Sequence, residues 1–350
     1  MVKGNVYNTI SIYSFERIDM MKKILIAIIF ITYLSSCNKD YSEQFTPYTT
    51  NPLNDTTWKT NISNNEFVHQ IIPILIDNFK VYIDSFNVAT GGTIQFTDSL
   101  QITFPPYACV GVSGTISSGK IKVVLIQLRK KGDFIRFGKP TTSFNNLLQT
   151  GGSFNVLLTQ NGFPISLASN VSYKIKYRDP APTNDMRFFN EVLSIISADT
   201  VRTWQQNDSA GSVNIWQQTL PQPPYNTLKG YEITSKKLSW INCDFFNDTT
   251  QPYTRLNVSL PLNFTNSNTA VYLVFKNKNI IARLRTNIPT KTYYFGRIPI
   301  GSEVKLVSIS KIGNEFYLGA KEITVQNANL ISLNPEQKPI AVINTFLDSL

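Results

Sequence analysis

The chain contains one histidine, His69, so chemistry that needs an imidazole has to use this residue. A Ser-His-Asp triad, a Cys-His pair or a histidine metal site would each have to include His69. Its neighbours Phe67, Val68 and Ile71 are apolar, which indicates a packed strand residue. The acidic residues are few and isolated, with no pair suited to the two-carboxylate chemistry of a hydrolase. We therefore expect no enzyme and no cofactor.

Residues 240–246, Trp-Ile-Asn-Cys-Asp-Phe-Phe, contain a second group that could do chemistry. Asn242 and Asp244 could bind a cation through two oxygen atoms, whereas calcium takes about six to eight. The alternative is an Asx-type turn that caps an aromatic core. We favour the turn and expect no metal site.

Two tryptophans, Trp204 and Trp216, fall in a segment rich in glutamine and proline. They could form an exposed platform on which sugars stack. Such residues more often pin a long loop onto a sheet, and we favour that interpretation.

Residues 21–37, MKKILIAIIFITYLSSC, indicate where the chain is sent. Lys22 and Lys23 precede an apolar run over residues 24–33 that is too short to span a bilayer of about 30 Å, which predicts a signal peptide rather than a transmembrane helix or a buried strand. The final Leu-Ser-Ser-Cys resembles the bacterial lipobox. That resemblance implies cleavage before Cys37 and a lipid on its thiol that holds the mature chain on a membrane.

The residues after Cys37, Asn-Lys-Asp, resemble the surface-export signal of lipoproteins from the Bacteroidetes phylum. The resemblance implies an outer-membrane, surface-exposed protein, with a periplasm-facing orientation as the alternative. The chain carries 33 Lys and Arg against 23 Asp and Glu, and these charges are scattered along it. We expect no nucleic-acid partner, because no face concentrates positive charge.

Two further cysteines, Cys109 and Cys243, have apolar neighbours and fall in different predicted domains. Export would permit a disulfide between them. Two buried free thiols are the alternative, which we favour.

Short β-rich runs are interrupted about every 8 to 12 residues by Gly, Asn, Pro or Asp, which predicts an all-β chain of antiparallel sandwiches. We expect a signal peptide with a spurious N-terminal extension over residues 1–36, a lipidated spacer over 37–66, a first sandwich over 67–183, a connecting segment over 184–228 and a second sandwich over 229–350. Apolar residues at helical spacing from Pro339 onward predict a short C-terminal helix.

The first predicted sandwich carries a family resemblance. Gly91-Gly92-Thr93-Ile94 and residues 102–108, Ile-Thr-Phe-Pro-Pro-Tyr-Ala, resemble the β-sandwich domain shared by ankyrins, zonula occludens proteins and netrin receptors, although Tyr107 replaces a glycine. Residues 130–167 are similar to an uncharacterised module of Bacteroidetes cell-surface proteins. The family's role implies protein-protein scaffolding.

Six Asp-Ser/Thr triplets resemble the O-glycosylation signal of exported Bacteroidetes proteins, and the best candidates for modification are Thr200, Ser209 and Thr249. Our first functional hypothesis is a non-enzymatic lipoprotein that binds a protein at the cell envelope. The alternative is a glycan-binding accessory lipoprotein, and it requires Trp204 and Trp216 to be accessible to solvent.

Overall fold

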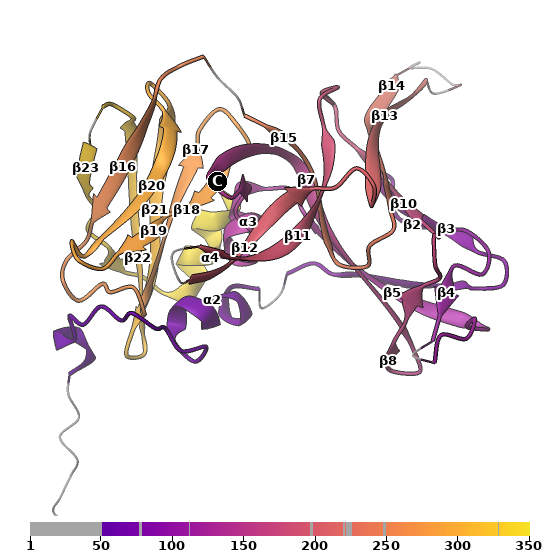
Figure 1. Cartoon of the computed structure of the whole chain (residues 1–350), viewed down its shortest axis with the longest axis horizontal. Helices are drawn as coiled ribbons and strands as arrows, with labels where there is room; N and C mark the ends of the chain where they lie inside the picture. Colours follow the sequence, from indigo (N-terminus) through magenta and orange to yellow (C-terminus); the bar gives the residue numbers. More distant parts are fainter. Residues whose placement is uncertain are drawn as a thin grey trace, which may run out of the picture. The chain divides into compact units, whose positions relative to one another are not determined.

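The computed structural model describes residues 51–76, 79–111, 113–196, 199–219, 221, 226–247, 250–327 and 329–350 (Figure 1). Residues 52–350 form one compact unit. The predicted signal peptide and Cys37 lie outside the described residues. The described part of the chain consists mainly of strands in antiparallel sheets, which confirms the predicted all-β class.

Two sheets form a first sandwich. Sheet A has the strand order β1 (Tyr82–Asn87), β5 (Lys120–Leu128), β7 (Asn146–Gln160), β15 (Trp240–Phe246), β11 (Arg187–Ile196) and β12 (Asp199–Gln206), and the short strands β6 (Thr142–Ser143) and β8 (Phe163–Pro164) also pair with β7. Sheet B has the order β13 (Gly211–Thr219), β14 (Thr227–Ser235), β10 (Tyr173–Arg178), β3 (Leu100–Phe104) and β2 (Gly92–Thr97). A separate short pair joins β4 (Cys109–Val110) to β9 (Ser166–Leu167).

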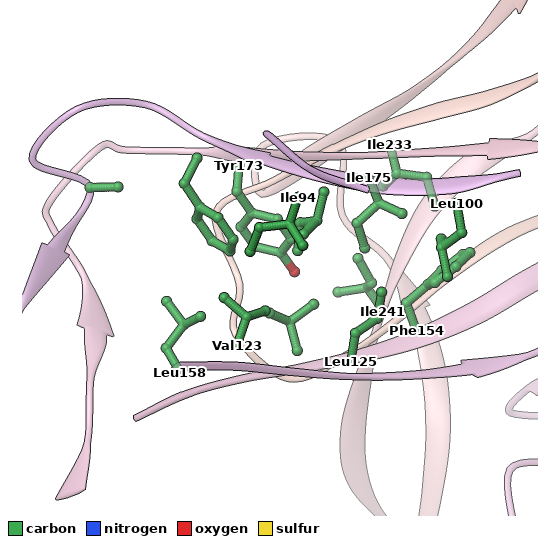
Figure 2. Packing of buried hydrophobic residues seen from close by; sticks show 14 of the residues in the cluster. Ile94, Leu100, Val123, Leu125, Phe154, Leu158, Tyr173, Ile175, Ile233 and Ile241 are labelled. Carbon is green, nitrogen blue, oxygen red and sulfur yellow. The ribbon is translucent and has the colours of Figure 1, made fainter. Parts of the chain in front are cut away.

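The core of this sandwich lies between sheets A and B. Side chains alternate along each strand, so Ile121, Val123 and Leu125 of β5 face inward and are buried. Figure 2 shows Val123 and Leu125 of sheet A pointing toward Ile175 and Ile233 of sheet B. The inward-facing side chains of the two sheets therefore form one continuous apolar layer.

Two further sheets form a second sandwich. Sheet C has the order β19 (Arg285–Asn287), β20 (Thr292–Pro299), β16 (Tyr253–Ser259) and β23 (Asn329–Ser332), and sheet D has the order β18 (Ile281–Arg283), β17 (Thr269–Phe275), β21 (Glu303–Ile312), β22 (Glu315–Thr324) and β24 (Glu336–Gln337). The β16–β23 pair is parallel, whereas the other pairs within these two sheets are antiparallel. Apolar residues of both sheets fill the space between them.

Three α-helices cover the outer face of sheet D: α2 (Phe67–Leu75), α3 (Lys131–Arg136) and α4 (Ile340–Asp348), while a short 3-10 helix, η1 (Pro52–Asn54), precedes them. Helix α4 confirms the predicted C-terminal helix, and its residues Ile343 and Leu347 are buried. The expected strand around His69 is wrong, because His69 lies in α2. Val68, Ile71 and Leu75 of that helix are buried together, since their spacing places them on one helical face.

The predicted domain boundaries differ from the observed ones. The expected connecting segment over residues 184–228 contains β11, β12 and β13, which belong to the two sheets of the first sandwich. Strands β14 and β15 also pair there, with β10 and β7, so the second sandwich begins at β16 rather than at residue 229. Local alternation identifies a strand but does not say which distant strand will be its neighbour.

The expected spacer over residues 37–66 is also shorter than predicted. Trp58 packs on Tyr293 of the second sandwich, with their ring centroids 5.1 Å apart. Asn266 accepts a hydrogen bond from the backbone N–H of Lys59 at 2.9 Å and donates one to its carbonyl oxygen at 2.7 Å. This part of the expected spacer is therefore held against the folded body.

Candidate functional site

One half of the outer face of sheet A presents a row of apolar side chains to solvent. Ile83 of β1 is in register with Val124 of β5, and Val124 is in register with Leu157 of β7. Ile83 is 58% exposed and Leu157 46% exposed, while Val124 is half-buried between them. We call these three residues the apolar row.

Strand β5 explains why this row exists. Residues 123–126, Val-Val-Leu-Ile, are apolar without interruption, so the strand has apolar side chains on both faces. Val123 and Leu125 face the core and are buried, which turns Val124 toward the outside. Ile126, two residues further on, packs against the helices that cover sheet D, whereas Val124 stays partly exposed.

The neighbours of the apolar row give the surface a mixed character. Lys122, in register with Ser85 and Thr159, occupies the adjacent row, and Lys120 the end of the same strand. Large exposed apolar side chains grouped on neighbouring strands mark interaction surfaces more often than single ones do. The arrangement would suit a partner with an apolar centre and a negatively charged margin.

A second cluster, around Lys139, is enclosed. The Lys139 ammonium pairs with the Glu191 carboxylate, whose other oxygen lies 3.1 Å from Arg202 Nη1. The Lys139 Nζ also lies 4.9 Å from the centroid of the Trp240 ring. Burial lowers the pKa of Lys139, and Glu191 partly offsets that effect. The pair fixes the segment that follows α3 onto strand β11.

The hollow beside this pair is small. Its interior has no room for a water molecule, and it is lined by residues of the same cluster, including Lys139, Glu191 and Trp204. A second hollow, lined by Asn146, Asn247 and Arg297 among others, has an interior volume of about 10 Å³. Small-molecule sites usually begin at roughly 300 Å³. The Lys139 cluster is best described as a packing element of the first sandwich.

The two tryptophans singled out from the sequence lie in strands rather than in a loop. Trp204 of β12 is 2% exposed and donates a hydrogen bond from Nε1 to the Pro140 carbonyl oxygen at 2.9 Å. It offers no face to a sugar, so the accessibility that the glycan hypothesis required is absent at this residue. Trp216 of β13 is half-buried, with Lys176 Nζ 4.2 Å from its ring centroid.

The cation-site hypothesis at Asn242 and Asp244 is not supported by their contacts. Both residues are buried in strand β15, next to a β-bulge, so the expected turn is wrong as well. Asn242 Nδ2 donates to Asp244 Oδ2 at 2.5 Å, and Thr150 Oγ1 donates to Asn242 Oδ1 at 3.0 Å. Burial raises the pKa of Asp244 well above its ordinary value. Over the described ranges, no group of three or more His, Cys, Asp and Glu side chains could hold a metal ion.

Cys109 and Cys243 are both free and both buried in the core of the first sandwich. The expected free thiols are confirmed, whereas their expected placement in different domains is wrong. Burial raises the pKa of Cys109 to about 11 and raises that of Cys243 further. The thiols are therefore protonated at neutral pH and unreactive.

The predicted modification sites remain predictions. Ser209 is exposed in the turn between β12 and β13, where its hydroxyl donates to Asn207 Oδ1 at 2.8 Å. Thr200 lies in strand β12, and Thr249, like Cys37, lies outside the described residues.

Comparison of the chain with protein-family models, with curated proteins and with solved structures found no match. Among the described residues, no helix has the length and apolar character needed to cross a membrane.

Proposed function

We propose that the protein is a non-enzymatic, lipid-anchored envelope protein that binds another protein through the apolar row of sheet A. The observation that carries the proposal is the register of Ile83, Val124 and Leu157 across three strands, with two of these side chains about half exposed or more. The lipobox-like Leu-Ser-Ser-Cys sequence supports the anchor, and the resemblance of the first sandwich to scaffolding domains supports a protein partner.

The chemistry of this surface favours a partner that is apolar at its centre and acidic at one side. Burying apolar area contributes about 25 cal/mol per Å², so the three residues of the row would supply the favourable term. Lys120 and Lys122 lie at one end of the same face and would meet the acidic side. Charges at such a margin govern the association rate and the choice of partner more than the affinity.

The test is affinity purification from crosslinked, detergent-solubilised outer membranes, with partners identified by mass spectrometry. We compare the unchanged protein with a Leu157→Lys variant. Leu157→Lys should recover about tenfold less partner, because a charge would have to be desolvated in an apolar contact.

Leu330→Lys is the matched control. Leu330 is 64% exposed on strand β23 of the second sandwich, away from the apolar row in the sheet order. This variant should recover as much partner as the unchanged protein. Equal recovery with Leu157→Lys, or no specific partner at all, would contradict the proposal.

A further inference from the structure

Strand β13 is the edge strand of sheet B. It lies at the end of the strand order, and only β14 pairs with it among the described strands. The pairing with β14 runs from Gly211 opposite Ser235 to Thr219 opposite Thr227 without a shift in register. The other side of β13 therefore presents a regular row of backbone N–H and C=O groups.

This edge lacks the features that usually prevent edge-to-edge pairing. Its sequence, Gly-Ser-Val-Asn-Ile-Trp-Gln-Gln-Thr, contains no charged residue and no proline. Natural edge strands are commonly protected by charge, proline or a bulge. The edge strands of sheet A carry charge, at Asp84 in β1 and at Arg202 in β12, and β2 at the opposite edge of sheet B has a register shift.

The edge is accessible along most of its length. Its first residue, Gly211, is half-buried beside the Phe188 ring. Beyond that point Asn214 is exposed, Ile215 is 38% exposed, and residues 217–219 are exposed. Pairing between β10 and β14 begins only at Gly230, so the hairpin of β13 and β14 extends past β10, as Figure 1 shows. A projecting hairpin lets a second folded molecule approach to strand-pairing distance.

We propose that β13 pairs antiparallel with β13 of a second copy of this chain, which joins the two copies of sheet B into one continuous sheet. The strand contains no charge that would meet a like charge in its own copy, so it carries no element that discriminates against self-pairing. Pairing around the middle of the strand would place Ile215 near its own counterpart and cover its exposed surface. The proposal does not depend on the apolar row, which lies on the other sheet of the sandwich.

The experiment is disulfide trapping in the full-length protein, both in native membranes and in detergent. Single cysteines replace residues 213–217 one at a time. Opposed residues of antiparallel strands have Cα atoms about 4.5 to 5.5 Å apart, which is within disulfide range. We expect a covalent dimer on non-reducing gels at one position or at two neighbouring positions of this series, with Ile215→Cys the foremost candidate.

Two controls define the background. The unchanged chain should give no dimer, because Cys109 and Cys243 are buried. Ser85→Cys, on the exposed edge strand β1, should give only random collisions.

A second pair of variants tests the pairing without a crosslink. Ile215→Lys should abolish the dimer measured by analytical ultracentrifugation, because it places two positive charges opposite each other, while Ile215→Thr should retain it. Circular dichroism checks that both variants fold. A protein that is monomeric and forms no crosslink above Ser85→Cys would overturn the proposal, and so would trapping of a different protein instead of a second copy.

Discussion

At the scale of single residues, Asp244 is a buried acid whose protonation state should affect stability. It is fully buried in strand β15, and its Oδ1 atom has no hydrogen-bond partner among the described residues. Burial raises the pKa of its carboxyl well above the ordinary value of 3.8, although the hydrogen bond from Asn242 opposes this shift. The folded protein therefore keeps a proton on Asp244 at pH values where the unfolded chain has lost it.

Because the folded protein retains this proton, we predict that its stability falls as pH rises above about 4. Above about pH 4 the folded state binds more protons at this site than the unfolded state, so its contribution to the free energy of unfolding falls by up to about 1.4 kcal/mol per pH unit. This contribution stops falling once the pH exceeds the pKa that Asp244 has in the folded protein. Asp244→Asn mimics the protonated acid and removes the effect, so it should be more stable than the unchanged protein at pH 7 and similar to it near pH 4.

Urea unfolding between pH 4 and pH 8 measures this difference. Asp84→Asn, on the exposed strand β1, is the matched control for loss of one carboxylate. A constant difference between Asp244→Asn and the unchanged protein across this pH range would show that Asp244 is ionised in the folded state.

At the scale of elements, the contact between α3 and α4 depends on a glycine. A Cβ atom on Gly132 would lie 1.9 Å from the carbonyl oxygen of Leu347, so the two helices approach at a distance that only glycine permits. Arg136 of α3 donates a hydrogen bond to the Asn344 carbonyl oxygen at 2.6 Å and pairs with Asp348 at 2.8 Å. Besides the burial of Ile343 and Leu347, helix α4 is therefore held on α3 by one close backbone contact and one arginine.

Gly132→Ala should displace α4. We expect a loss of about 1 to 3 kcal/mol in the free energy of unfolding, the usual cost of overpacking, together with faster amide exchange in α4. Gly296→Ala is the control, since an added methyl group there meets no atom within 4 Å. Unchanged exchange in α4 for Gly132→Ala would contradict the described packing.

The elements also show what the sequence can predict. Strand β5 follows from a β-rich apolar run and helix α4 from apolar residues at helical spacing. Helix α2 was missed because its apolar residues are nearly continuous and helical periodicity is hidden in such a run. Strands β12 and β13 were missed because their glutamine and asparagine residues carry little strand preference. Strand β11 is rich in Phe, Val and Ile, and it was missed because its place in the sheet depends on pairing with distant partners.

At the scale of the whole molecule, the two sandwiches are joined by hydrogen bonds between backbone atoms. The N–H of Thr150 in sheet A donates to the carbonyl oxygen of Asn279 at 3.0 Å, and the N–H of Thr141 donates to that of Ile281 at 2.7 Å. Helix α3, which follows β5 of the first sandwich, contributes to the apolar cluster on sheet D. The two sandwiches therefore share packing and are not independent modules.

The apolar row is formed by residues from distant parts of the chain, which explains why the sequence did not indicate it. Ile83, Val124 and Leu157 are far apart along the chain, and only the register of three strands brings them into one row. The apolar run in β5 was visible in the sequence, but it predicts equally well a strand covered on both faces. Which face stays open depends on where the helices pack.

The most direct test of the proposed function places a photo-activated crosslinker at residue 157 of the full-length protein in its native membrane. We predict one discrete protein adduct on irradiation, and no such adduct from the same crosslinker at residue 330, which is comparably exposed on the other sandwich. Absence of a protein adduct at residue 157, or the same adducts at both positions, would contradict the assignment of the apolar row as a protein-binding surface.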